Sequence, residues 1–368
     1  MTITVAAPVT RNPSGVHPKV PGRSTSMKRN FRTPRAVAAI MAAAIVGIGS
    51  NAAVAMADPG NGVGSHASDT VGYGPELTDE AAAFAYGLAN PDVAPQGANN
   101  WSCRPDATHP RPVVLVHGTW ASAYGAYAYM SPRLAKAGYC VFTFNYGRAD
   151  APGAGLVQPT IGATGYIEDS AAQLAAFVDR VRAVTGTAQV DVIGHSQGGV
   201  VIRQYLKFNG GADAGDPSRN KVKKVITFGA TNHGTTLSGL GSLLGVFKNA
   251  GLDLSAPTET LIGHAGIQQL IGSPVLTELN AGGDTMPGVE YTIVADRYDE
   301  VSSPYTRTYL QAGPGAQVHD VLLQDGCDLD TSDHNSMMFS PRATSIALQA
   351  LDPVGHPNLV CSLNPWLL

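Results

Sequence analysis

Charged residues are scarce in this chain. Asp, Glu, Lys and Arg make up only 14% of its 368 residues, and 24 basic residues stand against 28 acidic ones. Proteins that bind nucleic acid carry a basic surface for the phosphates, so this balance argues against a nucleic-acid partner. The hydrophobic content of 44% excludes a disordered chain.

Acidic residues are absent from the first 57 positions, which hold seven basic residues. The basic stretch 28–35, the uncharged stretch 36–49 and the small-x-small sequence 55–57 follow one another in the order of a secretory signal peptide. We therefore predict that residues 1–57 are a removed export signal, with Met27 as an alternative start. The alternative is a membrane anchor, which the alanine and glycine content of the stretch disfavours.

No later stretch approaches the roughly 20 apolar residues that a membrane span needs. We expect a mature chain of residues 58–368, forming one domain that is secreted as a monomer and either released or held at the cell wall. Its 17 basic and 28 acidic residues give a formal charge of −11. Such a charge disfavours strongly anionic lipid surfaces.

Cysteine is also rare. The chain has four, and none lies in a C-x-x-C pair, which argues against a thiolate zinc site, so we expect no metal. An even number in an exported protein suggests two disulfides. Of the three possible pairings we favour the one local in sequence, Cys103–Cys140 with Cys327–Cys361. The alternative is four buried free thiols.

Apolar runs rich in β-branched residues alternate with helical patterns along the rest of the chain. This alternation predicts an α/β fold with a mainly parallel sheet and helices on both faces. The interval 231–287 is too long for a plain connection, so we expect it to contain short helices and to form a cap or a mobile lid. Strands are predicted over 112–116, 140–146, 189–193, 222–229, 289–295 and 318–324, and helices over 80–88, 127–137, 167–184, 200–208 and 341–351.

The sequence Gly194-His195-Ser196-Gln197-Gly198 matches the pattern G-x-S-x-G. It follows a predicted strand and precedes a predicted helix, which is the setting of a nucleophile elbow. Glycines on both sides of the serine allow a tight turn that exposes its hydroxyl. Ser196 is therefore the candidate nucleophile, and the alternative is a glycine-rich turn with a solvated serine.

A serine nucleophile needs a base and a carboxylate that orients the base. In α/β-hydrolases both follow the serine in the order acid, then histidine. His334 lies between the last predicted strand and the last helix, and we prefer it to His233 and His319. For the acid we prefer Asp299 to Asp296, with Glu300 as a third choice.

The oxyanion of the tetrahedral intermediate needs N–H donors that are already in place. One should be the backbone N–H of Gln197, the residue after the nucleophile. The other should come from the turn after the first predicted strand, where Gly118 lets the backbone approach and Thr119 presents its N–H and its hydroxyl. The alternative for this turn is simple strand termination.

Four motifs, taken in their order along the chain, resemble those of secreted actinobacterial class 2 lipases and, more distantly, those of the yeast lipase B type. The resemblance covers most of the chain from about residue 75. The resemblance implies an α/β-hydrolase fold that acts on acyl esters without metal or organic cofactor. It implies nucleophile, acid and base roles for Ser196, Asp299 and His334 and oxyanion roles for Thr119 and Gln197. It also supports the local disulfide pairing. The motifs are 113–119, 194–198, 298–301 with Pro304, and 333–334.

We therefore predict a secreted triacylglycerol lipase that works through an acyl-enzyme on Ser196 and touches lipid interfaces transiently. A short-chain or polyester esterase, or an acyltransferase, would use the same residues and stays open. A non-catalytic binding protein on a hydrolase scaffold would usually lack one of the three catalytic residues.

Overall fold

A computed structural model describes residues 73–148, 161–242 and 258–366, without the side chains of 258–261. The predicted export signal lies outside the described residues, as does the stretch 243–257 of the predicted cap. No helix in the described ranges is both long and apolar enough to cross a bilayer.

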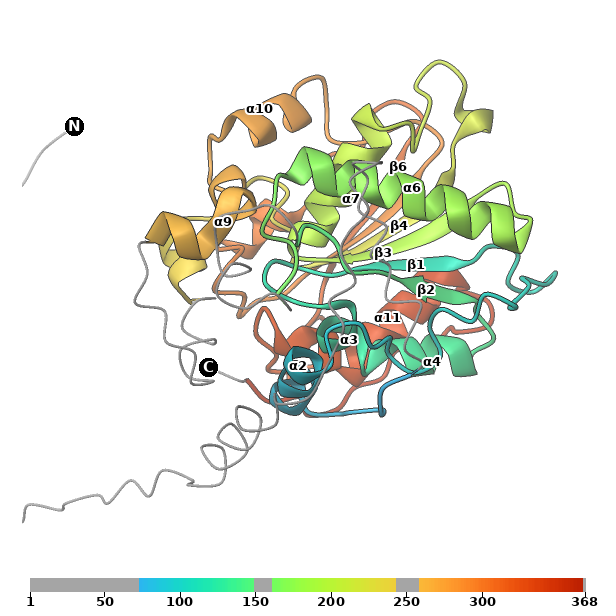
Figure 1. Ribbon diagram of the computed structural model, residues 1–368, viewed down its shortest axis with the longest axis horizontal. Coiled ribbons are helices and arrows are strands. Elements are labelled where there is room, and N and C mark those ends of the chain that lie inside the picture. Colours follow the sequence, from blue (N-terminus) through green and yellow to red (C-terminus); the bar gives the residue numbers. More distant parts are fainter. Residues whose placement is uncertain (1–72, 149–160, 243–257, 367–368) are drawn as a thin grey trace, which may run out of the picture. The chain divides into compact units, whose positions relative to one another are not determined.

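Six parallel strands form the sheet at the centre of the described chain (Figure 1). Their order across the sheet is β2-β1-β3-β4-β5-β6. The first strand therefore lies beside the edge strand β2, and β3 to β6 follow in sequence on the other side of β1. Because the strands are parallel, their carboxyl ends lie along one edge. The strands are β1 (Val113–Val116), β2 (Val141–Thr143), β3 (Val190–His195), β4 (Val222–Phe228), β5 (Glu290–Ala295) and β6 (Gln317–Leu322).

Helices cover both faces of this sheet. Val114 and Val116 of β1 pack into the apolar cluster under α6 (Ile167–Thr185) and α7 (Gln197–Phe208), while Val113 and Leu115 pack into the cluster on the other face. In Figure 1 the second face is covered by α2, α3, α4 and α11. These are α2 (Glu80–Ala89), α3 (Ala123–Tyr127), α4 (Met130–Lys136) and α11 (Pro341–Leu351).

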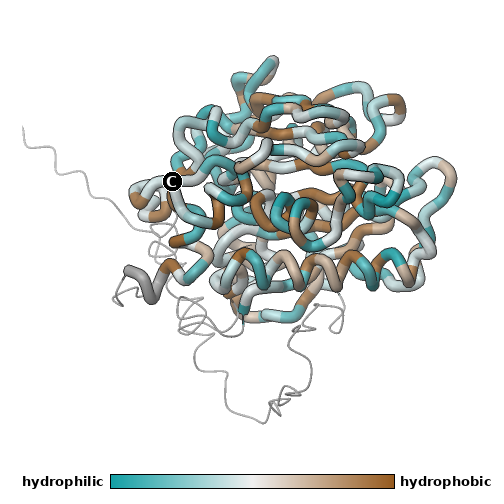
Figure 2. The backbone as a smooth tube through the Cα atoms, turned by 90° about the horizontal axis from the view of Figure 1, so that it is seen from above, coloured by the Kyte–Doolittle hydropathy of each residue, from teal (hydrophilic) through white to brown (hydrophobic). Residues whose placement is uncertain are grey.

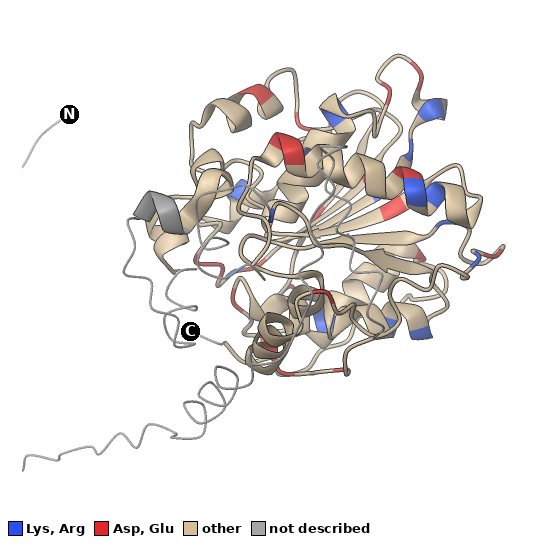
Figure 3. Cartoon of the chain, viewed as in Figure 1, with Lys and Arg blue, Asp and Glu red and all other residues tan. Residues whose placement is uncertain are grey.

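The hydropathy of the chain follows this layering. All four residues of β1 are buried, as expected for a strand covered on both faces. Hydrophobic segments of the tube in Figure 2 gather mainly in the interior, and charged residues of both signs are scattered over the described elements in Figure 3. The α/β sandwich predicted from alternating strands and helices is confirmed.

Two element predictions need correction. The single helix predicted over 127–137 is two helices, α3 and α4, because the Ser122 side chain accepts the Gly125 N–H and starts the first helix earlier. The strand predicted over 140–146 ends at Thr143, and the side chain of Asn145 instead accepts the Ala123 N–H. Side-chain capping and loop contacts of this kind override propensity.

The insertion between β4 and β5 contains the short helices that its length predicted. They are α9 (Thr258–Gln268) and α10 (Pro274–Asn280), the latter capped by Ser273. Thr235, near the start of the segment, and Leu270, just after α9, form an isolated bridge. Three short 3-10 helices, over Pro217–Arg219, Tyr305–Thr308 and Ser336–Phe339, were not predicted.

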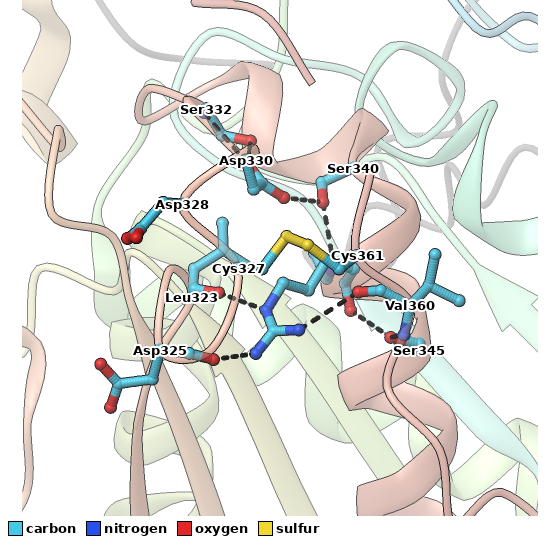
Figure 4. Close-up of a disulfide and its surroundings, with 12 residues drawn as sticks. Leu323, Asp325, Cys327, Asp328, Asp330, Ser332, Ser340, Ser345, Val360 and Cys361 are labelled. Atoms are coloured by element: carbon cyan, nitrogen blue, oxygen red, sulfur yellow. Dashed lines mark hydrogen bonds between the residues drawn. A yellow bond between two sulfur atoms is a disulfide. The ribbon is translucent and has the colours of Figure 1, made fainter. Parts of the chain in front are cut away.

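The favoured disulfide pairing is confirmed. Cys103 pairs with Cys140 and Cys327 pairs with Cys361. The second bond joins the loop after β6 to the C-terminal tail (Figure 4). Beside it, the guanidinium of Arg342 donates to the carbonyl oxygens of Leu323, Asp325 and Val360. One disulfide and several hydrogen bonds therefore hold this loop against α11 and the C-terminal tail.

Removing the second disulfide, by Cys327→Ser with Cys361→Ser, is expected to lower the free energy of unfolding by about 4 kcal/mol, because the bond closes a loop of 34 residues. Urea denaturation measures this. The matched control is Cys103→Ser with Cys140→Ser, which opens a loop of 37 residues. Equal stability of the wild type and either double variant would contradict the expectation.

Candidate active site

Three loops at the carboxyl edge of the sheet bring the predicted catalytic residues together. Ser196 follows β3 directly, Asp299 lies in the loop after β5, and His334 lies in the loop after β6. These residues are 35 to 138 positions apart in sequence. They meet because all three strands end at the same edge.

Ser196 occupies a tight turn between β3 and α7. Its backbone has φ 53° and ψ −125°, a strained conformation for a residue with a side chain. The Ser196 N–H donates to Phe228 O at 2.9 Å, and the Gly199 N–H donates to Ser196 O at 3.0 Å. At Gly198 a Cβ would lie 2.2 Å from Val116 O, so only glycine fits there. The strand–turn–helix geometry predicted around Ser196 is confirmed.

A continuous series of hydrogen bonds joins the three side chains. His334 Nε2 lies 2.8 Å from Ser196 Oγ, and His334 Nδ1 lies 2.9 Å from Asp299 Oδ2. The other carboxylate oxygen, Asp299 Oδ1, accepts the N–H groups of Val301 and Ser302 at 2.9 and 2.6 Å. All three side chains are buried. With one oxygen of Asp299 used by the backbone, the other faces the imidazole.

The alternative acids lie elsewhere. Asp296 is fully buried rather than on the surface, and its Oδ1 accepts from Tyr298 N and Gln324 Nε2. Glu300 Oε2 accepts the backbone N–H of His334 at 3.3 Å. In the described chain neither carboxylate hydrogen-bonds to the imidazole. The structure therefore sets Asp299, and neither alternative, against His334.

Neither alternative histidine hydrogen-bonds to Ser196 in the described chain. His233 contacts Arg307 O and Asp284 Oδ1, and His319 is exposed on the edge strand β6. Within the described ranges, no group of three or more His, Cys, Asp or Glu side chains is arranged to hold a metal ion.

Sequence reasoning missed His195, the residue before the nucleophile. Burial lowers the pKa of His195 to about 3, so its ring is neutral, and Nε2 lies 2.8 Å from His334 O. As a donor it holds the backbone of the base. The residue at this position of G-x-S-x-G is unspecified by the pattern, so the sequence carries no signal for the role.

The electrostatics favour a protonated base. Burial lowers the pKa of His334, but the negative charge of Asp299 and its hydrogen bond, with further contributions from Glu300 and Asp333, outweigh burial and raise this pKa above its usual value. An imidazolium formed beside Ser196 would therefore be stabilised. A histidine acting as base must be neutral, so activity should be lost as the pH falls through this raised pKa.

Glu300→Gln is expected to move the acid limb of the kcat/KM profile to lower pH. The substitution removes a negative charge near His334 and so lowers its pKa. Measuring kcat/KM against pH checks this. The control is Glu290→Gln, at the start of β5, where the carboxylate pairs with Lys223. If the acid limb lay at the same pH in the wild type and in Glu300→Gln, the charge of Glu300 would not contribute to the raised pKa of His334.

The two predicted oxyanion residues meet beside Ser196. A Cβ added to Gly118 would lie 3.0 Å from Ser196 Cβ, so the turn that carries Thr119 abuts the serine. Thr119 Oγ1 lies 3.5 Å from Gln197 Oε1. As the first residue of α7, Gln197 has a backbone N–H without a partner inside the helix. The turn and the start of α7 therefore lie together next to Ser196.

Gly229, just after β4, allows the loops that carry Asp299 and His334 to lie close to the end of that strand. A Cβ there would lie 2.9 Å from Asp299 Oδ2 and 3.1 Å from His334 Nδ1. The residue also has φ 54°, in the left-handed region. Any larger side chain would enter the Asp299–His334 contact.

Comparison with a solved lipase structure shows the same fold, and two further solved structures are similar to this chain. Lipase B of Aspergillus fumigatus is 20% identical with a TM-score of 0.52, and the match covers 70% of this chain and 55% of that one. The chain thus spans about half the length of that lipase. Lipase BlEst2 of Bacillus licheniformis in its mature form is 17% identical with a TM-score of 0.42, covering 67% and 94%. An esterase of Exiguobacterium antarcticum is 15% identical with a TM-score of 0.42, covering 66% and 91%.

The sequence itself matches a family model. No individual curated protein matches it significantly. The model described as lipase (class 2) matches residues 110–343, which include β1, the nucleophile elbow and the loops that carry Asp299 and His334. This match covers more than half of the chain, so the chain has the α/β-hydrolase fold and belongs to the class 2 lipase family.

Proposed function

We propose that this protein is an exported triacylglycerol lipase that works through an acyl-enzyme on Ser196. The observation that carries the proposal is the hydrogen-bond series from Ser196 Oγ through His334 to Asp299 Oδ2. This is the arrangement of a serine nucleophile, its base and the carboxylate that orients the base.

In the acylation half-reaction, Ser196 Oγ attacks the ester carbonyl carbon and its proton passes to His334 Nε2. Asp299 holds the Nδ1–H tautomer and stabilises the imidazolium that forms. The negative oxygen of the tetrahedral intermediate accepts from the N–H groups of Thr119 and Gln197. His334 then gives its proton to the leaving alkoxide, and the bond between carbonyl carbon and alkoxide oxygen breaks.

In the second half-reaction, water replaces the alcohol. His334 Nε2 takes a proton from the water, whose oxygen attacks the acyl carbon, and the same N–H groups bind the new oxyanion. His334 returns the proton to Ser196 Oγ as the carboxylic acid leaves. Hydrolysis thus consumes one water and releases one acid and one alcohol.

An apolar cluster beside the site supports a substrate with acyl chains. Trp120 follows Thr119 directly, and Val301 donates its N–H to Asp299, so the cluster borders both the oxyanion turn and the acid. Leu237, Ile267 and Ile271 of the insertion expose large apolar side chains, as expected for transient contact with lipid. The cluster consists of Trp120, Ile161, Leu240, Ile262 and Val301.

Export is supported by chemistry and by sequence. Disulfides persist in oxidising compartments and are rare in the cytosol, and this chain has two. The predicted signal over residues 1–57 supplies a route. The insertion over 231–287 is proposed as the cap of the site.

Hydrolysis of p-nitrophenyl esters from acetate to stearate by the mature chain tests the proposal, with Ser196→Ala as control. A lipase should remain active through the long chains and should also release fatty acid from emulsified triacylglycerol. Activity confined to short chains would replace the lipase with an esterase that uses the same residues. Product analysis in the presence of alcohol separates hydrolysis from acyl transfer.

A further inference from the structure

We infer that Gln269, the residue directly after α9 in the insertion, is a positioning residue for the oxyanion hole that makes the Thr119 hydroxyl a donor toward the developing charge. The inference rests on the proposed function of Ser196 and Thr119. It adds a residue from a segment that carries no recognised motif.

The side-chain amide of Gln269 is held by three hydrogen bonds that fix its orientation. Oε1 accepts from the Thr231 hydroxyl at 2.8 Å, and Nε2 donates to Ala265 O at 3.1 Å and to Thr119 Oγ1 at 2.9 Å. A flipped amide would set its N–H groups against the Thr231 hydroxyl and its oxygen against a carbonyl. Both hydrogens of Nε2 are used, and Oε1 also has a partner, so both ends of the amide are fixed.

The backbone of Gln269 is held as well. Its N–H donates to Ala265 O at 3.1 Å, and its carbonyl accepts the Thr235 N–H at 2.9 Å. Thr235 in turn donates its hydroxyl to Val301 O in the loop that carries Asp299. Gln269 is 1% exposed. The backbone and the side chain of Gln269 are therefore both held in place, so its amide keeps its position next to Thr119.

These contacts determine in which direction the Thr119 hydroxyl can point its hydrogen. Because Nε2 of Gln269 donates to Thr119 Oγ1, one lone pair of this oxygen is occupied and its own hydrogen must point elsewhere. Within the described residues this hydroxyl donates to Gln197 Oε1 at 3.5 Å, a long and weak contact. A developing oxyanion beside the Gln197 N–H is a stronger acceptor than that amide oxygen. The hydroxyl is thus prepared to donate to it.

The test uses Gln269→Met, which keeps the length of the side chain and removes the donor. Removal of a complete oxyanion donor lowers kcat by about 10²–10³, and a donor that remains but is no longer oriented should cost less, about 10-fold. We expect kcat for p-nitrophenyl butyrate to fall about 10-fold with little change in KM. The inhibition constant of phenylboronic acid, whose adduct with Ser196 resembles the tetrahedral intermediate, should rise in parallel.

Gln268→Met is the matched control. This neighbouring side chain accepts the Ile167 N–H and donates to Glu168, on α6 and away from Thr119. It should leave kcat and the boronic acid constant near their wild-type values. Equal losses in the two variants would show a general packing effect and overturn the inference.

A double-mutant cycle gives the decisive result. Thr119→Val removes the hydroxyl but leaves the backbone N–H, and kcat should fall about 100-fold. If Gln269 acts through that hydroxyl, Gln269→Met should cause no further loss in the Thr119→Val background. Losses that multiply would overturn the inference.

Two further measurements keep the outcome interpretable. If Gln269→Met does not fold, Thr231→Val removes the partner of Oε1 and should give a smaller fall in kcat that likewise disappears in the Thr119→Val background. If Ser196→Ala is as active as the wild type, the proposed function has failed. If Ser196→Ala is inactive but both cycles are additive, only the role of Gln269 has failed.

Discussion

Ser196→Ala is expected to lower kcat about 10⁶-fold with the fold intact, the size of loss seen when a serine hydrolase loses its nucleophile. The side chain makes one recorded hydrogen bond, to His334 Nε2, so its loss leaves the elbow in place. The turn is held by backbone contacts of residue 196 with Phe228 and Gly199, which alanine keeps. Ester hydrolysis, fluorophosphonate labelling and thermal unfolding together measure the effect.

A second buried serine provides the control. Ser131 on α4 donates its hydroxyl to Gln96 O and is fully buried. Ser131→Ala should lower the free energy of unfolding by about 1 kcal/mol and leave kcat unchanged. Retention of wild-type kcat or of fluorophosphonate labelling by Ser196→Ala would refute the nucleophile.

Asp299→Asn is expected to lower kcat about 10⁴-fold at neutral pH. The amide oxygen must stay at the Oδ1 position, because that atom accepts the N–H groups of Val301 and Ser302. The amide NH₂ then faces His334 Nδ1 and selects the tautomer with its proton on Nε2. That tautomer cannot accept the Ser196 proton. The pH dependence of kcat/KM and the KM value report the change.

The neighbouring buried carboxyl is a matched control for this substitution. Burial, followed by repulsion from Asp299, raises the pKa of Asp296 to about 8. Asp296 is therefore mostly protonated at pH 7, and Asn keeps the two hydrogen bonds to Oδ1. Asp296→Asn should retain activity, whereas loss of activity equal to that of Asp299→Asn would leave the acid unassigned.

The same variant should change stability with a defined sign. An unfolded aspartate ionises near pH 4, while folded Asp296 stays protonated up to about pH 8. The wild type therefore loses stability as the pH rises between these values. Asp296→Asn removes that loss, and the free energy of unfolding at pH 7 should rise by roughly 1–3 kcal/mol. Urea denaturation at pH 5 and pH 7 measures it.

Much of the architecture follows from the sequence by itself. The strands, most helices and the elbow around Ser196 follow from short-range patterns, whereas the cysteine pairing was favoured as the one local in sequence and is supported by the resemblance to class 2 lipases. Hydrophobic periodicity and a glycine-bounded turn depend on near neighbours, which one sequence displays. The order Ser196, Asp299, His334 also carries long-range information, since parallel strands deliver successive loops to one edge.

Only the tertiary structure decided contacts between segments distant in sequence. Asp299 and Asp296 are three residues apart, and nothing local shows that the backbone uses Oδ1 of Asp299 and leaves Oδ2 for His334. His195 holds the His334 carbonyl across 139 positions, and Gln269 reaches Thr119 across 150. Hydrogen bonds need both partners within about 3 Å and correctly oriented, and only the packed chain defines that geometry.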